Sequence, residues 1–420
     1  MESAEQNMFS FAANLFTIMY MRLINQRNKT LEKEAFNHMN EGYQRQLSYL
    51  KEDGSFSLFR SDWNNSDSSV WLTAYCARIL QDASFYEWEN FIYIDSQIIK
   101  RNVRWLLQYQ REDGSFYEIT WSPDRKMNKT GFIDANGDVR QTNISLTAHV
   151  LITLATVKDL SGELGTRVSL AQRRGLQFIE KNMKWLQQTK EPYEVAIVAY
   201  ALLLCKSPIA GHVVTILQRH ARIDGEYMYW GTKEIPNGPS KLENQKYFSL
   251  PRLPYEYDAL NIETTAYALL VYVSRREYFV DPIVNWLNSQ RLTDGGWAST
   301  QDTSVALKAL IEFTVHSRIR EVSSLSLTLE ATSLPGKWQE LKIQENNLGR
   351  LQSIMIPNAW GTVKVQAKGA GFAILQMHVQ YNVDVERFQT KPPVPSFELD
   401  TRAVFHGRNQ SHISYLACQR

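Results

Sequence analysis

The feature that most constrains this chain is an alternation between two kinds of helical segment. One kind is apolar nearly all round, which marks a helix enclosed on every side. The other is amphipathic, with one apolar stripe and solvated charges opposite it. Inner helices that alternate with outer helices predict a ring of helical hairpins, an α/α toroid. The enclosed segments are residues 9–23, 70–80, 146–157, 195–204 and 265–273, and the amphipathic ones are 31–50, 168–186 and 283–287.

Four Asp-Gly turns repeat the same pattern, each with an aromatic residue three positions after the Asp. Glycine accepts the positive φ that ends a helix, and Asp hydrogen-bonds the turn. We expect the aromatic side chain to pack back into the core. Repeats of this length predict stacked hairpins, each of which needs its neighbours to cover an apolar face. The turns are Asp53, Gly54, Phe56; Asp113, Gly114, Phe116; Asp224, Gly225, Tyr227; and Asp294, Gly295, Trp297.

The composition permits a large core and excludes several partners. With 420 residues and 44% hydrophobic content, the chain is long enough for more than one domain. Lys plus Arg number 46 and Asp plus Glu 44, so the net charge of +2 creates no field that would gather nucleic acid. No apolar run reaches the length of a membrane span. The run 9–21 has no basic flank or cleavage site, so we interpret it as a buried helix rather than a signal peptide.

Cysteines and glycosylation sequons indicate the compartment. Three cysteines are too few and too widely spaced for a disulfide framework or a zinc site. Cys76 and Cys205 lie in apolar helical runs and are predicted to be buried free thiols, whereas Cys418 is expected to pair with a cysteine outside this chain. Five Asn-x-Ser/Thr sequons suggest a secreted protein, of which this chain is expected to be a piece. They begin at Asn28, Asn64, Asn128, Asn143 and Asn409.

Two regions depart from the helical alternation. Residues 223–258 are rich in proline and aromatic residues and are predicted to form a long loop, packed across one face of the ring or, alternatively, presenting a partner-binding surface. After about residue 317 the period changes from 3.6 to 2, which predicts strands at 325–329, 362–365 and 373–383. A proline-rich linker precedes a further strand pattern from residue 396.

The opening residues MESAEQNM resemble the reactive motif of the complement and alpha-2-macroglobulin family, Gly-Cys-Gly-Glu-Gln-Asn-Met. In that motif a Cys sulfur is joined to the side-chain carbonyl of a Gln three residues on. Glu5, Gln6, Asn7 and Met8 match it, but Ser3 stands in the place of the Cys and Ala4 in the place of the second Gly. Similarity extends through WLTAY at 71–75, SLTA at 145–148, ETTAYALL at 263–270 and GGWASTQD at 295–302.

The substitutions remove the chemistry that the family motif implies. A serine hydroxyl is a far weaker nucleophile than a thiolate unless a base activates it, and Ala4 lacks the positive-φ freedom of Gly. Family members that react with hydroxyls use a His in the loop after the second Asp-Gly turn. The matching loop, residues 118–131, contains no His. His149 lies in an apolar helix and is predicted to be a core residue. We therefore expect no acyl bond between Ser3 and Gln6 and no catalytic residue; the polar residues of the loop include Ser122, Asp124, Arg125 and Lys126.

The resemblance also implies a domain order. Residues 1–316 would form a thioester-type α/α toroid domain without the thioester, and 317–385 the second half of a β-sandwich CUB domain. Residues 386–395 would be a linker and 396–420 the start of a macroglobulin, or receptor-binding, β domain. The family's CUB domain is split around the thioester domain, so the half in this chain would have unpaired strand edges. In lacking the cysteine, this chain is similar to the macroglobulin complement-related proteins, a branch of the insect members of the family.

These observations predict a non-catalytic extracellular recognition protein, opsonin-like or acting at cell surfaces and junctions, that contacts protein partners or microbial and cell surfaces without a covalent bond. No cofactor or metal is expected: residues 134–138 superficially resemble a calcium loop, but the Gly is at the fourth position and no bidentate Glu follows. The alternative is an α/α-toroid enzyme such as a terpene cyclase, prenyltransferase or glycosidase. Neither a DxDD motif nor a suitable zinc pattern supports that alternative.

Overall fold

A computed structural model describes residues 3–60, 67–84, 88, 90–120, 127, 131–133, 139–141, 143–231, 254–292, 295–316, 324–334, 336, 338–358, 360–371 and 373–379. Contacts divide the chain into two units, and the described helices and strands belong to the first, which comprises residues 1–235 and 254–376. This unit is mainly helical, as predicted.

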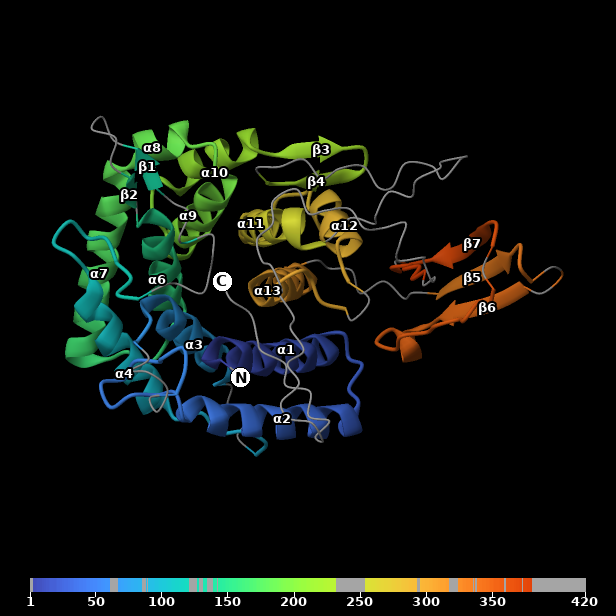
Figure 1. Cartoon of the computed structure of the whole chain (residues 1–420), viewed down its shortest axis with the longest axis horizontal. Coiled ribbons are helices and arrows are strands. Elements are labelled where there is room, and N and C mark those ends of the chain that lie inside the picture. The colour runs from blue at the N-terminus through green and yellow to red at the C-terminus, as the bar shows by residue number, and fades with distance from the viewer. Residues whose placement is uncertain are drawn as a thin grey trace, which may run out of the picture. The chain divides into compact units, whose positions relative to one another are not determined.

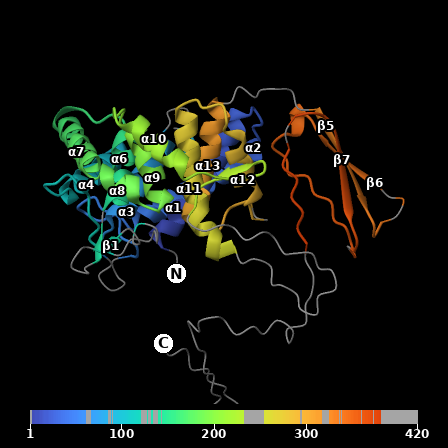
Figure 2. The ribbon, with the colours of Figure 1, turned by 90° about the horizontal axis from the view of Figure 1, so that it is seen from above.

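The enclosed helices pack against one another in chain order, and α13 returns to α1, which closes a ring (Figure 1). Figure 2 shows α9, α11 and α13 in this order from a second direction. The sequence interpretation missed α13 because its first half carries more polar residues than the other enclosed segments. No described helix is long and apolar enough to cross a membrane. The inner helices are α1 (Ala4–Leu23), α3 (Val70–Ala83), α6 (Ile144–Thr156), α9 (Pro192–Leu204), α11 (Pro254–Ser274) and α13 (Thr300–His316).

Helices α2, α4, α7 and α10 each pack mainly on the inner helix that precedes them, whereas α12 packs on both α11 and β4 (Tyr227–Tyr229) and the short α8 packs on α7 and α10. The predicted amphipathic segment 168–186 is divided between α7 and α8, which are separated at Asn182. In α2 the expected apolar stripe holds except at Leu31, which is 49% exposed in the first turn. The outer helices are α2 (Lys29–Leu47), α4 (Ser96–Leu106), α7 (Gly162–Lys181), α8 (Met183–Gln188), α10 (Ala210–Arg219) and α12 (Asp281–Ser289), with a 3-10 turn η2 (Leu107–Tyr109) after α4.

One hydrogen bond recurs where an Asp-Gly turn meets the next inner helix. The backbone N–H of a buried aromatic residue donates to the hydroxyl of a threonine in that helix, which is the fourth residue of α3, α6 and α13 and lies farther along in α11. Because both groups are buried, the bond satisfies a backbone donor that water cannot reach. The pairs are Phe56 with Thr73 (3.0 Å), Phe116 with Thr147 (2.9 Å), Trp230 with Thr265 (2.9 Å) and Trp297 with Thr303 (2.9 Å).

Contacts between inner helices show that they run in the same direction. The Tyr75 hydroxyl on α3 donates to Ser304 Oγ on α13 at 3.0 Å, and one to two turns later Lys308 on α13 contacts Asp82 on α3. Helix α6 runs in the same direction as α3, because His149 Nε2 lies 3.1 Å from the carbonyl of Trp71 and, one turn later, Thr153 Oγ1 donates to the carbonyl of Ala74 at 3.0 Å. The amino ends of these helices therefore lie at one face of the ring and their carboxyl ends at the other.

The prediction for Tyr227 was wrong. Its side chain is 40% exposed, whereas Trp230 is fully buried and makes the recurring hydrogen bond to Thr265. The reason is a short hairpin of β3 (Arg222–Asp224) and β4 (Tyr227–Tyr229), which moves the aromatic position three residues along the chain. The predicted loop at 223–258 was also wrong at both ends, since it begins in this hairpin and α11 starts at Pro254. Residues 232–253 lie outside the described part of the chain.

Glycine is required in two of the turns. Gly54 has φ +93° and Gly114 has φ +96°, a region that favours glycine. A Cβ at Gly54 would lie 2.8 Å from the carbonyl oxygen of Arg101, and one at Gly114 would lie 2.2 Å from that of Arg174. Each turn thus abuts the backbone of the following outer helix, so conformation and space both exclude a side chain.

The later residues form an antiparallel sheet of order β6 (Trp338–Ile343), β5 (Ser324–Ala331) and β7 (Val363–Ala370), with a 3-10 turn η3 (Glu345–Asn347). This sheet confirms the strand predicted at 325–329. It also confirms the strand predicted at 362–365, except that the observed strand begins one residue later, at Val363. The strand predicted at 373–383 was wrong over 373–379, which is not in a strand. Alternating side chains do not form a strand without a neighbouring backbone to share the ladder. A further short pair joins β1 (Gly131–Ile133) to β2 (Val139–Gln141).

We expect Thr147→Val to destabilise the helical ring by about 1–3 kcal/mol, because the change leaves the buried N–H of Phe116 without an acceptor. The measurement is the free energy of unfolding in denaturant, followed by circular dichroism. The matched control is Thr215→Val, whose exposed hydroxyl bonds only to Gly211 O in its own helix. Equal free energies of unfolding for both variants would contradict the role assigned to the recurring bond.

Candidate functional site

The candidate site is the beginning of α1, where the degenerate motif lies. Ser3 is the N-cap of this helix, with extended backbone angles (φ −91°, ψ 159°). Its hydroxyl oxygen accepts a hydrogen bond from Gln6 N–H at 3.2 Å, and the Gln6 side-chain oxygen accepts one from Ser3 N–H at 3.3 Å. This reciprocal pair is a capping box, which satisfies two backbone donors at the helix end.

The capping box uses the two positions at which the family motif forms its bond. A Cys and a Gln three residues apart have the same spacing as the Ser-x-x-Gln pattern that caps helices. In this chain each side chain bonds the backbone of the other residue rather than its side chain. Ala4 between them is fully buried, and its N–H donates to the carbonyl of Leu58 at 2.9 Å. The geometry is that of a capped helix terminus.

Glu5 closes the ring at this end. Its Oε1 accepts a hydrogen bond from Gln301 Nε2 at 3.1 Å and another from the Thr300 hydroxyl. Thr300 and Gln301 begin α13, so the carboxylate lies at the amino end of that helix, where its negative charge is favourable. Glu5 therefore connects the first inner helix to the last one.

Asn7 and Met8 complete the match to the family motif, and both are buried. Asn7 Nδ2 donates to the Gly42 carbonyl at 2.8 Å and to Gln46 Oε1 at 2.7 Å, which binds α1 to α2. Gln46 Nε2 in turn contacts the Sγ of Cys76 on α3 at 3.3 Å. Burial raises the pKa of the Cys76 thiol well above its usual value, so this cysteine is an inert core thiol, as predicted.

His149 occupies the core, as the sequence predicted. It is 2% exposed, its ring stacks on Trp71 with centroids 5.5 Å apart, and its Nε2 lies 3.1 Å from the Trp71 carbonyl. Burial lowers its pKa well below the ordinary value, with a further decrease from the charge of Arg78. His149 is thus a neutral, hydrogen-bonded core residue and is not available to Ser3.

Glu118 has a role that the sequence interpretation missed. Its carboxylate accepts hydrogen bonds from Val70 N–H (2.8 Å), Trp71 N–H (2.9 Å) and the hydroxyl of Ser69 (3.0 Å), which together form the amino end of α3. Burial raises its pKa in spite of these donors. Glu118 lies two residues after Phe116, but the N–H that it binds at the start of α3 is 48 residues earlier in the chain. A contact over that separation leaves no local sequence pattern. The loop residues Ser122, Asp124, Arg125 and Lys126 lie outside the described residues.

Two of the five sequon asparagines are described. Asn28 is exposed and is the N-cap of α2, its Oδ1 accepting from Thr30 N–H at 3.0 Å. Asn143 is half-buried in a left-handed conformation (φ 53°) immediately before α6. Asn64, Asn128 and Asn409 lie outside the described residues, as do Cys418 and residues 134–138. Cys205 is half-buried rather than fully buried. Within the part that is described, no group of three or more His, Cys, Asp or Glu residues could hold a metal ion.

Comparison with known proteins agrees with this architecture. A family model described as "A-macroglobulin TED domain" matches residues 1–313. The chain belongs to this alpha-2-macroglobulin and complement family. It is 27% identical over 401 residues to Thioester-containing protein 1 allele S1 of Anopheles gambiae and 28% identical over 389 residues to Complement C3 of Lethenteron camtschaticum. These alignments cover 94% and 90% of this chain but only 25% and 21% of the respective relatives.

We expect Ser3→Ala to destabilise the start of α1 by about 1 kcal/mol, because Gln6 N–H loses its acceptor. Ser3→Asp should retain most of the stability, since Asp is also a good N-cap residue. Hydrogen exchange of the first turn of α1 measures the effect. Unchanged protection in the alanine variant would show that Ser3 does not cap the helix.

The stability of the ring should decrease as the pH falls below about 6.5, the pKa of histidine in an unfolded chain. The folded pKa of His149 is lowered, so below this pH the unfolded chain binds a proton that the folded chain does not. His149→Gln should reduce the dependence of the free energy of unfolding on pH between about 5 and 7. The control is His38→Gln, at an exposed position on α2, which should retain the dependence.

Proposed function

We propose that this protein is a non-catalytic, extracellular, complement-like recognition protein that contacts its partners without forming a covalent bond. The observation that carries the proposal is the capping box at Ser3 and Gln6. The hydroxyl and the carboxamide that would have to react are both hydrogen-bonded to backbone, and the sulfur that supplies the family's leaving group is replaced.

The remaining motif residues support the same proposal. Glu5, Asn7 and Met8 hold α1 to α13 and α2 or fill the core, so their presence is explained by packing. His149, the histidine nearest in sequence to the family's loop position, is a neutral core residue. A domain that keeps its scaffold in this way retains a surface for binding after losing its reactive bond.

The chain spans about a quarter or less of the relatives that it matches, so the activity of a whole protein is a matter of proposal. We propose an opsonin-like or cell-junction role, with protein partners or microbial and cell surfaces. Secretion is supported by the sequons, of which Asn28 is exposed. The sheet β6-β5-β7 supports the proposed partial CUB domain over 317–385. Trp338 and Trp360 are more than 60% exposed, as expected for apolar side chains that the missing half of such a domain would cover.

An α/α-toroid enzyme is disfavoured by the space inside the ring. Its axial cavity measures about 40 Å³, which holds about three water molecules. An isoprenoid or a sugar needs several hundred Å³. Buried side chains from α3, α6, α9, α11 and α13 fill the axis instead.

The test is incubation of the whole parent protein with labelled methylamine and with labelled glycerol. We expect no label at Gln6 above the level of a Gln6→Ala variant, since no acyl bond joins it to Ser3. The Anopheles relative named a thioester-containing protein serves as the positive control. Stoichiometric labelling at Gln6, detected by mass spectrometry of the peptide, would overturn the proposal.

A further inference from the structure

The axial cavity of the ring has a composition that the proposed function does not explain. It is bordered by the same position on four of the inner helices: Arg78, Ile152, Leu270 and Lys308 each lie five residues after the threonine of the recurring hydrogen bond. Asp82 and Thr156, in the last turns of α3 and α6, border it farther along. The cavity is therefore close to the carboxyl ends of the inner helices, at the face opposite Ser3.

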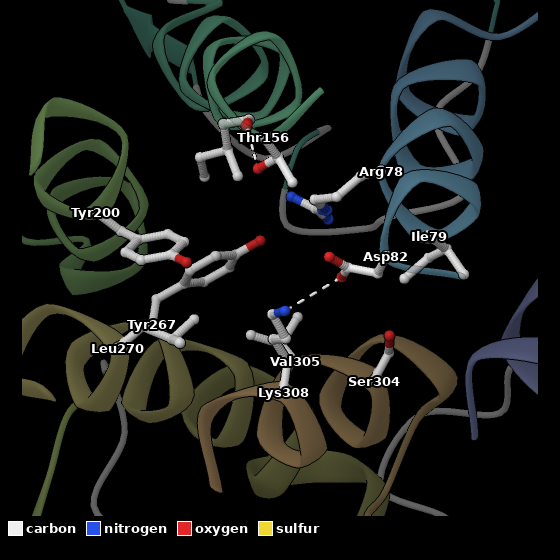
Figure 3. A pocket seen from close by; sticks show the side chains of 11 residues that line it. Arg78, Ile79, Asp82, Thr156, Tyr200, Tyr267, Leu270, Ser304, Val305 and Lys308 are labelled. Carbon is white, nitrogen blue, oxygen red and sulfur yellow. Dashed lines mark hydrogen bonds and ion pairs between the residues drawn. The ribbon is translucent and has the colours of Figure 1, made fainter. Parts of the chain in front are cut away.

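Two cationic side chains point into this cavity, as Figure 3 shows, and only one of them is compensated. Lys308 Nζ lies 3.2 Å from Asp82 and 3.4 Å from Glu312. Burial alone would lower the pKa of Lys308, but these two carboxylates together raise it, so its charge is retained and fully paired.

Arg78 has no such counter-ion. Among the described residues it forms neither an ion pair nor a hydrogen bond, although Asp82 is one helical turn away; its guanidinium lies over the ring of Tyr75, 5.9 Å from the centroid. A guanidinium presents donors in a planar fork that matches a carboxylate. After burial, its charge is a second cause of the lowered pKa of the neighbouring His149.

The other polar side chains that line the cavity suit a small anion that accepts hydrogen bonds, such as a carboxylate. Tyr200 and Tyr267 enter it from α9 and α11, on the side that faces Arg78 (Figure 3). Burial raises the pKa of Tyr200 to about 12, so its phenol keeps a proton to donate at neutral pH. A volume of about 40 Å³ accommodates a carboxylate group but not a larger ligand.

Exposed aromatic residues at the same face favour a polypeptide as the source of that carboxylate. Tyr278 and Phe279 follow the end of α11 and are 93% and 79% exposed. Because the inner helices run parallel, this turn lies at the face formed by their carboxyl ends, the face to which the cavity is closer. Exposed aromatic residues at the same face as a charged pocket are characteristic of protein-binding surfaces.

We propose that this axial cavity binds one acidic side chain of a protein partner, with Arg78 as its counter-ion and the turn at Tyr278 and Phe279 contacting the adjacent chain. The proposal rests on non-covalent recognition as the function and assigns a surface and a ligand chemistry to it. The competing role of Arg78 is structural, complementing the partial negative charge at the carboxyl ends of the helices. That role predicts no ligand.

The test uses the full chain and two capped tetrapeptides, acetyl-Ala-Phe-Glu-Ala-amide and its Gln analogue, with sodium acetate as a third probe. Affinities are measured by ligand-observed NMR. We expect the Glu peptide to bind about tenfold or more tightly than the Gln peptide, the fold-change of one charged hydrogen-bonded contact. Arg78→Met should remove this preference and Arg78→Lys should keep part of it. Arg104→Met, at an exposed position on α4, should leave it unchanged.

Two further arms keep the proposal testable. Phe279→Ala should weaken binding of the Glu peptide and leave binding of acetate unchanged. Equal affinity of the wild-type chain for acetate and for the Glu peptide would overturn a polypeptide as the source of the carboxylate. If Arg78→Met does not fold, Leu270→Phe narrows the cavity without a change of charge and should abolish binding of the Glu peptide. Equal binding of the Glu and Gln peptides to the wild-type chain would overturn the proposal. The labelling of Gln6 is independent of these measurements, so failure here leaves the non-covalent function separately testable.

Discussion

The structure depends on how the amino ends of the inner helices are satisfied. Helices that run parallel around a ring place their unpaired backbone N–H groups and their positive partial charges at one face. A carboxylate from another element meets them at two of these helices: Glu118 at α3 and Glu5 at α13. The recurring threonine bond adds an acceptor for each turn that leads into such a helix. Ring closure and helix capping are thus achieved by the same side chains.

This constraint explains how the motif residues could keep their positions under the proposed loss of the reaction. The start of α1 needs a cap, and the spacing between the positions of the family's Cys and Gln is the spacing of a capping box. Replacing sulfur by the Ser3 hydroxyl converts the pair into a stabilising element. Glu5, Asn7 and Met8 have packing roles that are independent of any acyl bond. Selection for stability alone is therefore sufficient to maintain them.

The face formed by the carboxyl ends of the inner helices carries charged side chains on the axis of the ring. There the axis contains a half-buried ion pair, Lys308 with Asp82, and the guanidinium of Arg78, which has no ion-pair partner among the described residues. Burying an ion pair contributes little net stability, because desolvation offsets much of the attraction between the charges. Apolar side chains at these positions would fill the axis without the cost of desolvating charges. The charged residues on the axis are therefore the part of the ring that packing alone does not account for.

The sequence by itself determined the periodic parts of this protein. Apolar segments and Asp-Gly turns indicated inner and outer helices, and the positive φ of Gly54 and Gly114 follows from the local chemistry of a turn. The core position of His149 was also readable, because it depends on the apolar residues near it in the chain. Tertiary structure alone decided the rest. The cap that Glu118 supplies to α3, the replacement of Tyr227 by Trp230 after a hairpin, and the meeting of Arg78 with Lys308 on the axis join residues distant in the chain. Such contacts are selected by the closure of the ring, which no local pattern encodes.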